Sequence, residues 1–126
     1  MERRKTVVVA DDEPVVRHLV QATLALGGHA VEVLEARTGA EVLELVRRTP
    51  VDLVLLDVGM PELDGLEACR ALKADPATAR TPIVFVTARV QPADRAAAAD
   101  AGASAYLTKP FGVRVLSETV RRLLAL

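Results

Sequence analysis

The stretch TVVVADDE, residues 6–13, decides the fold class of this chain. It places an unbroken apolar run, Val7 to Ala10, directly before two aspartates and a glutamate. A strand that is apolar on both faces is typical of the middle of a parallel sheet that helices cover on both sides. The stretch therefore predicts a buried central strand over residues 6–10, with charged groups at its carboxyl end.

Four further strands are predicted along the chain. DLVLL (52–56) and PIVFV (82–86) repeat the apolar, β-branched pattern of the first strand, and we expect them to be central as well. VEVLEA (31–36) carries two glutamates, which suits a strand at the edge of the sheet. AYLT (105–108) is a short fifth candidate.

Longer segments with apolar residues three and four positions apart separate these strands and predict helices. The helices are expected over residues 14–26, 40–48, 65–74, 92–101 and 113–126. Pro14 stands in a first turn, Thr38 is a candidate N-cap, and Gly27 follows a last turn. Strict alternation of strands and helices indicates an α/β fold: a doubly wound, five-stranded parallel sheet in the order 2-1-3-4-5 with five helices, which is a flavodoxin-like arrangement.

Length and composition limit the classes of protein to which this chain can belong. A chain of 126 residues is one domain's worth, and we expect a single domain over residues 1–126. The 16 basic and 17 acidic side chains nearly cancel and aromatic residues make up only 2%, so direct binding of nucleic acid is not expected. The single cysteine, Cys69, suits a reducing cytoplasm, and the first apolar run is too short for a signal peptide or a membrane span.

Polar or ionisable residues follow each central strand and the short fifth strand. They are Asp11 and Asp12 after the first strand, Asp57 after the third, Thr87 after the fourth and Lys109 after the fifth. Because ligands of open parallel sheets bind beyond the carboxyl ends of the strands, we expect these side chains to gather at one edge of the sheet.

Several carboxylates in one place repel one another. Two of them about 5 Å apart repel by roughly 3 kcal/mol at an effective dielectric constant of about 20. A hard divalent cation would relieve this repulsion, and a site with few protein oxygens suits magnesium better than calcium. The alternative is that the acids cap the helices that follow them. Capping is sufficient for Asp11 or Glu13 alone, but it explains Asp11, Asp12 and Asp57 together less well.

These residues belong to a longer ordered set. In chain order it comprises Asp11-Asp12, Asp57, Met60-Pro61, Asp64-Gly65, Thr87-Ala88, Tyr106 and Lys109-Pro110-Phe111. In order and spacing the set resembles the response-regulator receiver domain of two-component signalling, the CheY-like family, over nearly the whole chain. The resemblance implies a phosphorylation-controlled switch. Such a domain catalyses only its own phosphorylation and dephosphorylation, so it is not expected to be an enzyme.

The resemblance also implies a role for each residue at the strand ends. Asp57 would accept a phosphoryl group from a kinase's phosphohistidine, and Lys109 would pair with a phosphoryl oxygen. Magnesium would be bound by Asp12, Asp57 and the backbone carbonyl of Gly59. Asp11 would reach the ion through a water molecule.

A second group of residues would carry the switch. Thr87 would hydrogen-bond the phosphoryl group, Ala88 would leave room for it, and Tyr106 would turn inward as Thr87 shifts. The peptide bond between Lys109 and Pro110 is expected to be cis, which would aim the lysine inward. Without the resemblance, Thr87 is equally well explained as a β-branched strand residue and Tyr106 as a half-buried core residue.

Partners follow from the same resemblance. They are a sensor histidine kinase or phosphotransfer protein upstream, and an output domain or effector protein downstream. Candidate kinase-contacting residues on the first helix and after the fifth strand are Val15, Arg17, His18, Phe111 and Gly112. Ser104-Ala105 replaces the acidic pair that supports a dimer in the family's winged-helix regulators, so we expect a monomer or a weak phosphorylation-dependent dimer.

Two other functions compete with this interpretation. A phosphatase of the haloacid dehalogenase type also uses an aspartate nucleophile and magnesium, but it needs a second carboxylate where this chain has Gly59. A pseudo-receiver, which binds partners without taking phosphate, would be favoured by loss of an acid or of the lysine, and all are present. The remaining conspicuous side chains, His18, His29 and Cys69, are expected to be structural.

Overall fold

Five parallel strands form one sheet at the centre of the computed structural model, which describes residues 4–28 and 30–125. The strands are β1 (Lys5–Ala10), β2 (Val31–Ala36), β3 (Leu53–Leu56), β4 (Ile83–Thr87) and β5 (Ala105–Thr108). Their order is β2-β1-β3-β4-β5, which confirms the predicted order and places β2 at an edge.

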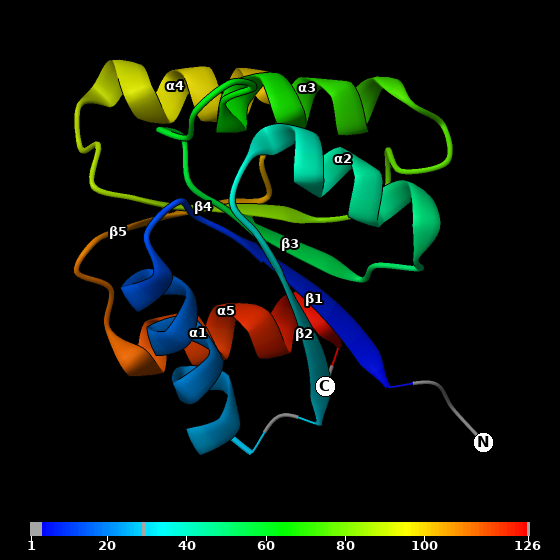
Figure 1. The fold of residues 1–126 in the computed structure, drawn as a ribbon. Helices are drawn as coiled ribbons and strands as arrows, with labels where there is room; N and C mark the ends of the chain where they lie inside the picture. Colours follow the sequence, from blue (N-terminus) through cyan, green and yellow to red (C-terminus); the bar gives the residue numbers. More distant parts are fainter. Residues whose placement is uncertain (1–3, 29, 126) are drawn as a thin grey trace.

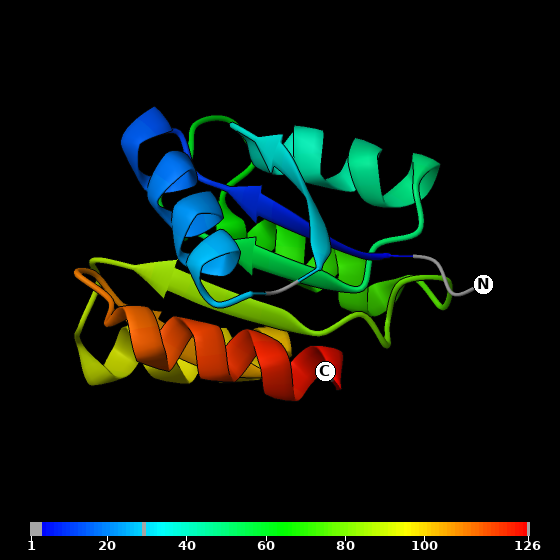
Figure 2. The same cartoon turned by 90° about the horizontal axis from the view of Figure 1, so that it is seen from below.

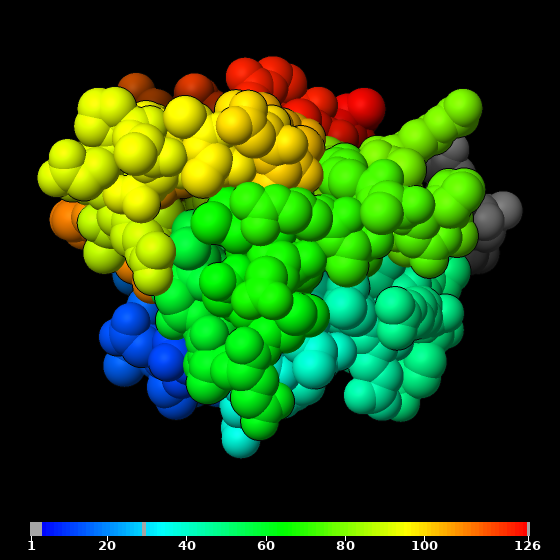
Figure 3. Space-filling model, turned by 90° about the horizontal axis from the view of Figure 1, so that it is seen from above, coloured from blue at the N-terminus to red at the C-terminus, as the bar shows by residue number. Residues whose placement is uncertain are grey.

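Helices cover both faces of this sheet, as the doubly wound prediction requires. They are α1 (Pro14–Leu26), α2 (Gly39–Arg48), α3 (Gly65–Ala74), α4 (Pro92–Ala101) and α5 (Val113–Leu124). α2, α3 and α4 lie on one face of the sheet, while α1 and α5 lie on the other (Figures 1 and 2). Figure 3 shows the outer surface that α2, α3 and α4 form side by side. No helix among the described residues is long and apolar enough to cross a membrane.

The central strands are buried on both faces because successive side chains point to opposite sides. In β3, for example, Val54 and Leu56 pack with α2, α3 and α4, while Leu53 and Leu55 pack with α1 and α5. No residue of β3 is more than 1% exposed. This two-sided burial is the reason for the unbroken apolar runs in the sequence.

Most predicted boundaries agree with the structure to within one residue. β3 begins at Leu53 rather than at Asp52. The Asp52 carboxylate accepts a hydrogen bond from the Thr6 amide at 2.8 Å, which ties the start of β3 to β1. The last helix ends at Leu124, where Ala125 adopts a left-handed φ of 57°. Its predicted end, Leu126, lies outside the described residues.

Two glycines let the connection from β3 to α3 pack closely, Gly65 against the end of β3 and Gly39 of α2 against the connection itself. The Gly65 amide donates to the Val58 carbonyl at 3.0 Å, and a Cβ on Gly65 would collide with the Asp57 carbonyl oxygen. The Gly39 amide donates to the Leu63 carbonyl at 3.0 Å, and a Cβ there would also collide with that oxygen. Only glycine permits both approaches, which fix the loop that follows Asp57.

The buried side of α1 includes a charged residue. Val15 and Leu19 are 75% and 50% exposed, whereas Arg17 is buried together with Val20 and Leu24. A charged side chain is found at such a position only where its polar atoms have partners, and Arg17 has two.

Candidate functional site

The strand ends bring the predicted residues together at the edge of the sheet that lies on the left in Figure 1. Backbone hydrogen bonds extend the sheet pattern beyond the strands and set the positions of these residues. The Asp57 amide donates to the Ala10 carbonyl at 3.0 Å, and the Lys109 amide donates to the Thr87 carbonyl at 2.8 Å. Residues that are far apart in the sequence are thereby held in fixed register.

Lys109 lies between two buried carboxylates. Its Nζ atom is 2.6 Å from Asp11 Oδ2 and 3.2 Å from Asp57 Oδ2, and it is 3.8 Å from the more exposed Glu13 Oε1. Asp11 is 2% exposed and Asp57 8% exposed, so neither charge is screened well by solvent. The distances are those of charge-assisted hydrogen bonds. One ammonium group therefore offsets the charge of two acids.

For Asp11 and for Lys109, burial and the hydrogen bond between them shift the pKa in opposite directions. Burial raises the pKa of Asp11, since the hydrogen bonds from Lys109 and from the Glu13 amide offset the lost hydration only in part. Burial acts to lower the pKa of Lys109, but the hydrogen bond to Asp11 and the negative charge of Asp57 outweigh it and hold that pKa above its usual value. The lysine is therefore protonated at neutral pH.

Three carboxylates are close enough together to share a cation. Asp11, Asp12 and Asp57 each offer an oxygen, and these oxygens all lie within 4.8 Å of one another. Asp12 is exposed, so the cluster is open to solvent on that side. Hard carboxylate oxygens with room for water are the donors that magnesium prefers, and the residues present fit that ion.

Arg17 is a site residue that the sequence interpretation missed. Its guanidinium donates to the Asp11 carbonyl at 2.7 Å and to Glu35 Oε1 at 2.9 Å. Arg17 therefore holds the backbone of Asp11, while Lys109 holds the Asp11 side chain. The only signal in the sequence was an arginine three residues before Val20 on the apolar side of α1. Because it is buried, Arg17 is not part of the exposed surface proposed for kinase contact, and that assignment was wrong.

Thr87 ends β4, and Tyr106 lies in the neighbouring strand β5, opposite Phe85 in β4. Thr87 is 1% exposed, and its Oγ1 accepts a hydrogen bond from the Arg89 amide at 3.3 Å. Tyr106 is half-buried, and its hydroxyl donates to the Arg89 carbonyl at 2.8 Å. The peptide bond between Lys109 and Pro110 is cis in the structure.

Of the residues expected to be structural, Cys69 and His18 are not part of the acidic cluster. Cys69 is buried and its thiol donates to the Ala101 carbonyl at 3.3 Å, and burial raises its pKa and so disfavours the thiolate. His18 is exposed on α1, and His29 lies outside the described residues.

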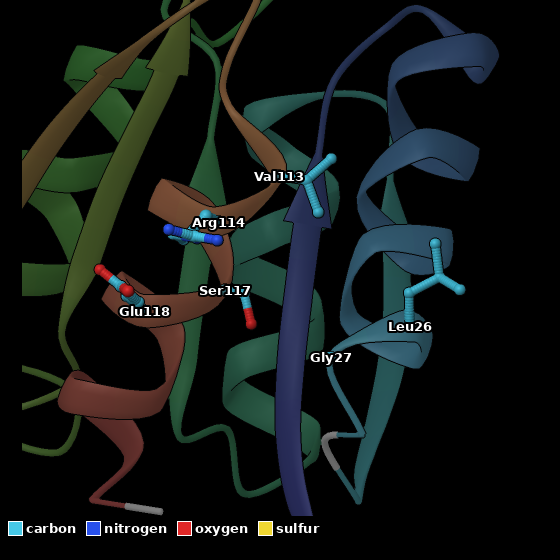
Figure 4. Close-up of a pocket in the computed structure, with 6 residues that line it drawn as sticks. All are labelled: Leu26, Gly27, Val113, Arg114, Ser117 and Glu118. Carbon is cyan, nitrogen blue, oxygen red and sulfur yellow. The ribbon is translucent and has the colours of Figure 1, made fainter.

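A separate groove of about 500 Å³ lies between α1 and α5. Figure 4 shows Leu26 and Gly27 at the end of α1, and Val113 and Arg114 at the start of α5. None of the residues at the carboxyl edge of the sheet lines this groove, so it is distinct from the candidate site.

Comparison with known proteins adds independent information. Residues 7–121 match the family model of the response regulator receiver domain. The response regulator MprA of Mycobacterium leprae (strain TN) is 42% identical over 118 residues, which are 94% of this chain and 50% of that protein. A gliding motility regulatory protein of Myxococcus xanthus is 41% identical over 122 residues, which are 96% of this chain and 15% of that protein. The chain thus spans half or less of the length of these relatives.

Solved structures agree with the observed fold. The chemotaxis protein CheY4 of Vibrio cholerae is similar with a TM-score of 0.87 and 30% identity, covering 97% of this chain and 100% of that one. The phosphorylated cyanobacterial phytochrome response regulator RcpA is similar with a TM-score of 0.88 and 25% identity, covering 98% of this chain and 96% of that one.

The bond between Arg17 and Glu35 predicts a pH-dependent stability. The hydrogen bond from Arg17 lowers the pKa of Glu35, so its stabilisation is present above the usual glutamate range and is lost as the pH falls through the folded-state value. Glu35→Gln should lower the free energy of unfolding by about 1 kcal/mol at neutral pH, because Glu35 is partly exposed and screened. Urea unfolding should show this difference shrink below about pH 4. Glu32→Gln on the same strand is the control, and an equal effect there would contradict the assignment.

Repulsion among the acids predicts that removing one of them stabilises the metal-free protein. Asp12→Asn should raise the melting temperature in the presence of a chelator by about 1–4 °C, because one lysine faces several carboxylates. Saturating magnesium should cancel or reverse the difference, since the variant has one acid fewer to bind the ion. A melting temperature that is unchanged or lower in chelator would argue against strain in the cluster.

Proposed function

The chain belongs to the response-regulator receiver family of two-component signalling, and from this premise we propose that it is a phosphorylation-controlled switch whose acceptor is Asp57. The observation that carries the proposal is the contact of Lys109 with two buried carboxylates at the carboxyl edge of a parallel sheet. Such a site can accept a phosphoryl group because Asp57 supplies a nucleophilic oxygen and Lys109 supplies a fixed positive charge 3.2 Å from it.

The proposed reaction is transfer of a phosphoryl group from a histidine to an aspartate. A bond forms between an Asp57 carboxylate oxygen and phosphorus as the bond between phosphorus and the donor's imidazole nitrogen breaks. The imidazole leaves with the electron pair and takes up a proton. A carboxylate needs no activating base, so the protein's main contribution is to position the reactants and to stabilise negative charge.

A magnesium ion is the cofactor that we propose for this site. Asp12, Asp57 and the backbone carbonyl of Gly59 would hold it, and Asp11 would reach it through water. When bound, the ion would supply positive charge to the acids and to the transferring phosphoryl oxygens. The cluster of three carboxylate oxygens supports this assignment.

Lys109 would stabilise the negative charge of the phosphoryl group. Its ammonium already lies 3.2 Å from an Asp57 oxygen, so a small movement would bring it to a phosphoryl oxygen. Thr87 would donate its hydroxyl to the same group, and the proposed readout is the position of the Tyr106 ring. Thr87 and Tyr106 both bond to Arg89, so a shift of Thr87 can be transmitted to the tyrosine through one residue.

The partners that we propose are a sensor histidine kinase or phosphotransfer protein upstream and an output domain or effector protein downstream. Exposed Val15, His18 and Gly112, with the partly buried Phe111, remain candidates for contact with the kinase. We further propose that residues 1–126 make up one receiver domain, acting as a monomer or as a weak phosphorylation-dependent dimer. The expectations that it does not bind nucleic acid and that it resides in the cytoplasm stay predictions.

Of the two competing functions, only the pseudo-receiver is compatible with the family to which the chain belongs. The family assignment leaves the haloacid dehalogenase type without support. The pseudo-receiver differs from the proposal only in whether Asp57 takes a phosphoryl group, and the first experiment below decides between them.

Acetyl phosphate with magnesium tests the acceptor. The wild-type protein should gain the mass of one phosphoryl group, and Asp57→Asn should gain none, because the amide is not a nucleophile. Asp64→Asn is a matched control, since asparagine caps α3 as well as the aspartate that now bonds the Glu67 amide, and it should be labelled like the wild type. Intact-protein mass spectrometry measures both, and a mass gain that persists in Asp57→Asn would refute the assignment.

Beryllofluoride, which mimics a phosphoryl group on aspartate, tests the lysine. Lys109→Ala should weaken its binding by about tenfold or more, because a hydrogen bond between charged groups is lost. Magnesium binding in the absence of beryllofluoride should change much less, since a lysine ammonium cannot be a metal ligand. Lys5→Ala, at the opposite end of β1, is the control. Isothermal titration calorimetry follows both ligands, and equal binding to all three proteins would remove Lys109 from the site.

A further inference from the structure

The ring of Tyr106 has a charged neighbour that the proposed function does not use. The guanidinium carbon of Arg95 lies 4.9 Å from the centroid of the tyrosine ring, a distance typical of a cation–π contact. Arg95 is exposed on α4, while Tyr106 is in the neighbouring strand β5. Figure 3 shows α4, in yellow, lying along this side of the molecule.

Two further contacts locate the ring. Its hydroxyl donates to the Arg89 carbonyl at 2.8 Å, and its centroid lies 6.2 Å from that of Phe85 in β4. The ring also packs against the part of the core that faces α2, α3 and α4. Tyr106 is therefore in a packed position, held by the β4 side chain, by the loop after β4 and by Arg95 from α4.

The other α4 residues that share a hollow with Arg95 have side chains too short to make the same contact with the ring. Two surface hollows of about 210 Å³ each adjoin the contact, and Arg95 and Tyr106 are the residues that line both. The other α4 residues that line the first hollow are the alanines Ala98 and Ala99, whose side chains are too short to replace a guanidinium. Arg95 is thus the one α4 residue that lines both of these hollows beside the ring.

A short series of contacts leads from this pair to the site. Arg95 contacts the ring of Tyr106, the hydroxyl of Tyr106 bonds the Arg89 carbonyl, and the Arg89 amide bonds Thr87 Oγ1 at 3.3 Å. Arg89 is thus held by Thr87 through its amide and by Tyr106 through its carbonyl. Any force that holds the ring also restrains the backbone of the loop after β4.

We propose that Arg95 is a positioning residue, which holds the Tyr106 ring in its packed position and so favours the loop conformation in which Arg89 bonds both Thr87 and Tyr106. The link to phosphorylation rests on the proposed function, in which the phosphoryl group draws Thr87 inward and favours the packed ring. By linkage, a side chain that stabilises the packed ring also strengthens binding of the phosphoryl mimic.

The position of the ring can be measured without any ligand. Tyr106 is the only tyrosine and the chain has no tryptophan, so tyrosine fluorescence reports on this ring alone. Arg95→Leu, which replaces the guanidinium with a shorter, uncharged side chain, should raise the constant for collisional quenching by acrylamide. Arg95→Lys keeps a cation and should lie between this variant and the wild type. Arg70→Leu, at an exposed site on α3, is the control and should leave quenching unchanged.

The second measurement tests the link to the site. Arg95→Leu should raise the beryllofluoride concentration for half-saturation, with magnesium present, by about two- to fivefold, equivalent to about 0.5–1 kcal/mol. In a Tyr106→Leu background the same substitution should have no effect, because the ring that Arg95 contacts is gone.

The outcomes separate this inference from the proposed function. If quenching is the same in wild type and Arg95→Leu, or if Arg95→Leu acts equally with and without Tyr106, Arg95 does not position the ring. If the wild-type protein binds no beryllofluoride, the proposed function is wrong, and the quenching series alone then decides whether Arg95 holds Tyr106.

Discussion

The contact of one ammonium group with two buried carboxylates is the constraint on which the rest of the structure depends. Lys109 bonds Asp11 and Asp57 from a strand end that lies 98 and 52 residues further along the chain. Charges this poorly solvated are stable only when their partners are held in place. The parallel sheet does so, because its backbone hydrogen bonds continue from β1 to Asp57 and from β4 to Lys109.

A second cation, Arg17, also holds Asp11 in place. Arg17 bonds the carbonyl of Asp11, while Lys109 bonds its carboxylate, so the acidic loop is held at its backbone and at its side chain by different residues. At Asp57, the lack of a side chain on Gly65 lets the start of α3 lie against the Asp57 carbonyl. The backbone of Asp57 is therefore fixed on two sides, by the hydrogen bond from its amide to the Ala10 carbonyl and by the close approach of Gly65 to its own carbonyl.

The edge of the sheet also connects this buried site with the surface. Thr87 is buried and its carbonyl accepts a hydrogen bond from the Lys109 amide, whereas Tyr106 is half-buried. Both Thr87 and Tyr106 are bonded to Arg89. A shift of Thr87, which the proposed switch requires, cannot be absorbed by the fully buried strand β4 that carries it. It can be absorbed by the loop after β4 and by a ring that has open space on two sides.

The sequence by itself determined the α/β class, because apolar periodicity within each segment can be read without coordinates. It also determined the strand order and the set of residues at the strand ends, because the order and spacing of these residues along the chain match those of a known family. Most element boundaries also followed from local signals such as Pro14 and the Thr38 cap, which bonds the Glu41 amide at 3.1 Å. Only the tertiary structure decided that Arg17 is buried, that Val15 and Leu19 are exposed, and that Arg95 contacts Tyr106. These depend on how α1 is rotated against β2 and how α4 lies beside β5, and such packing between elements distant in the chain leaves no periodic trace in the sequence.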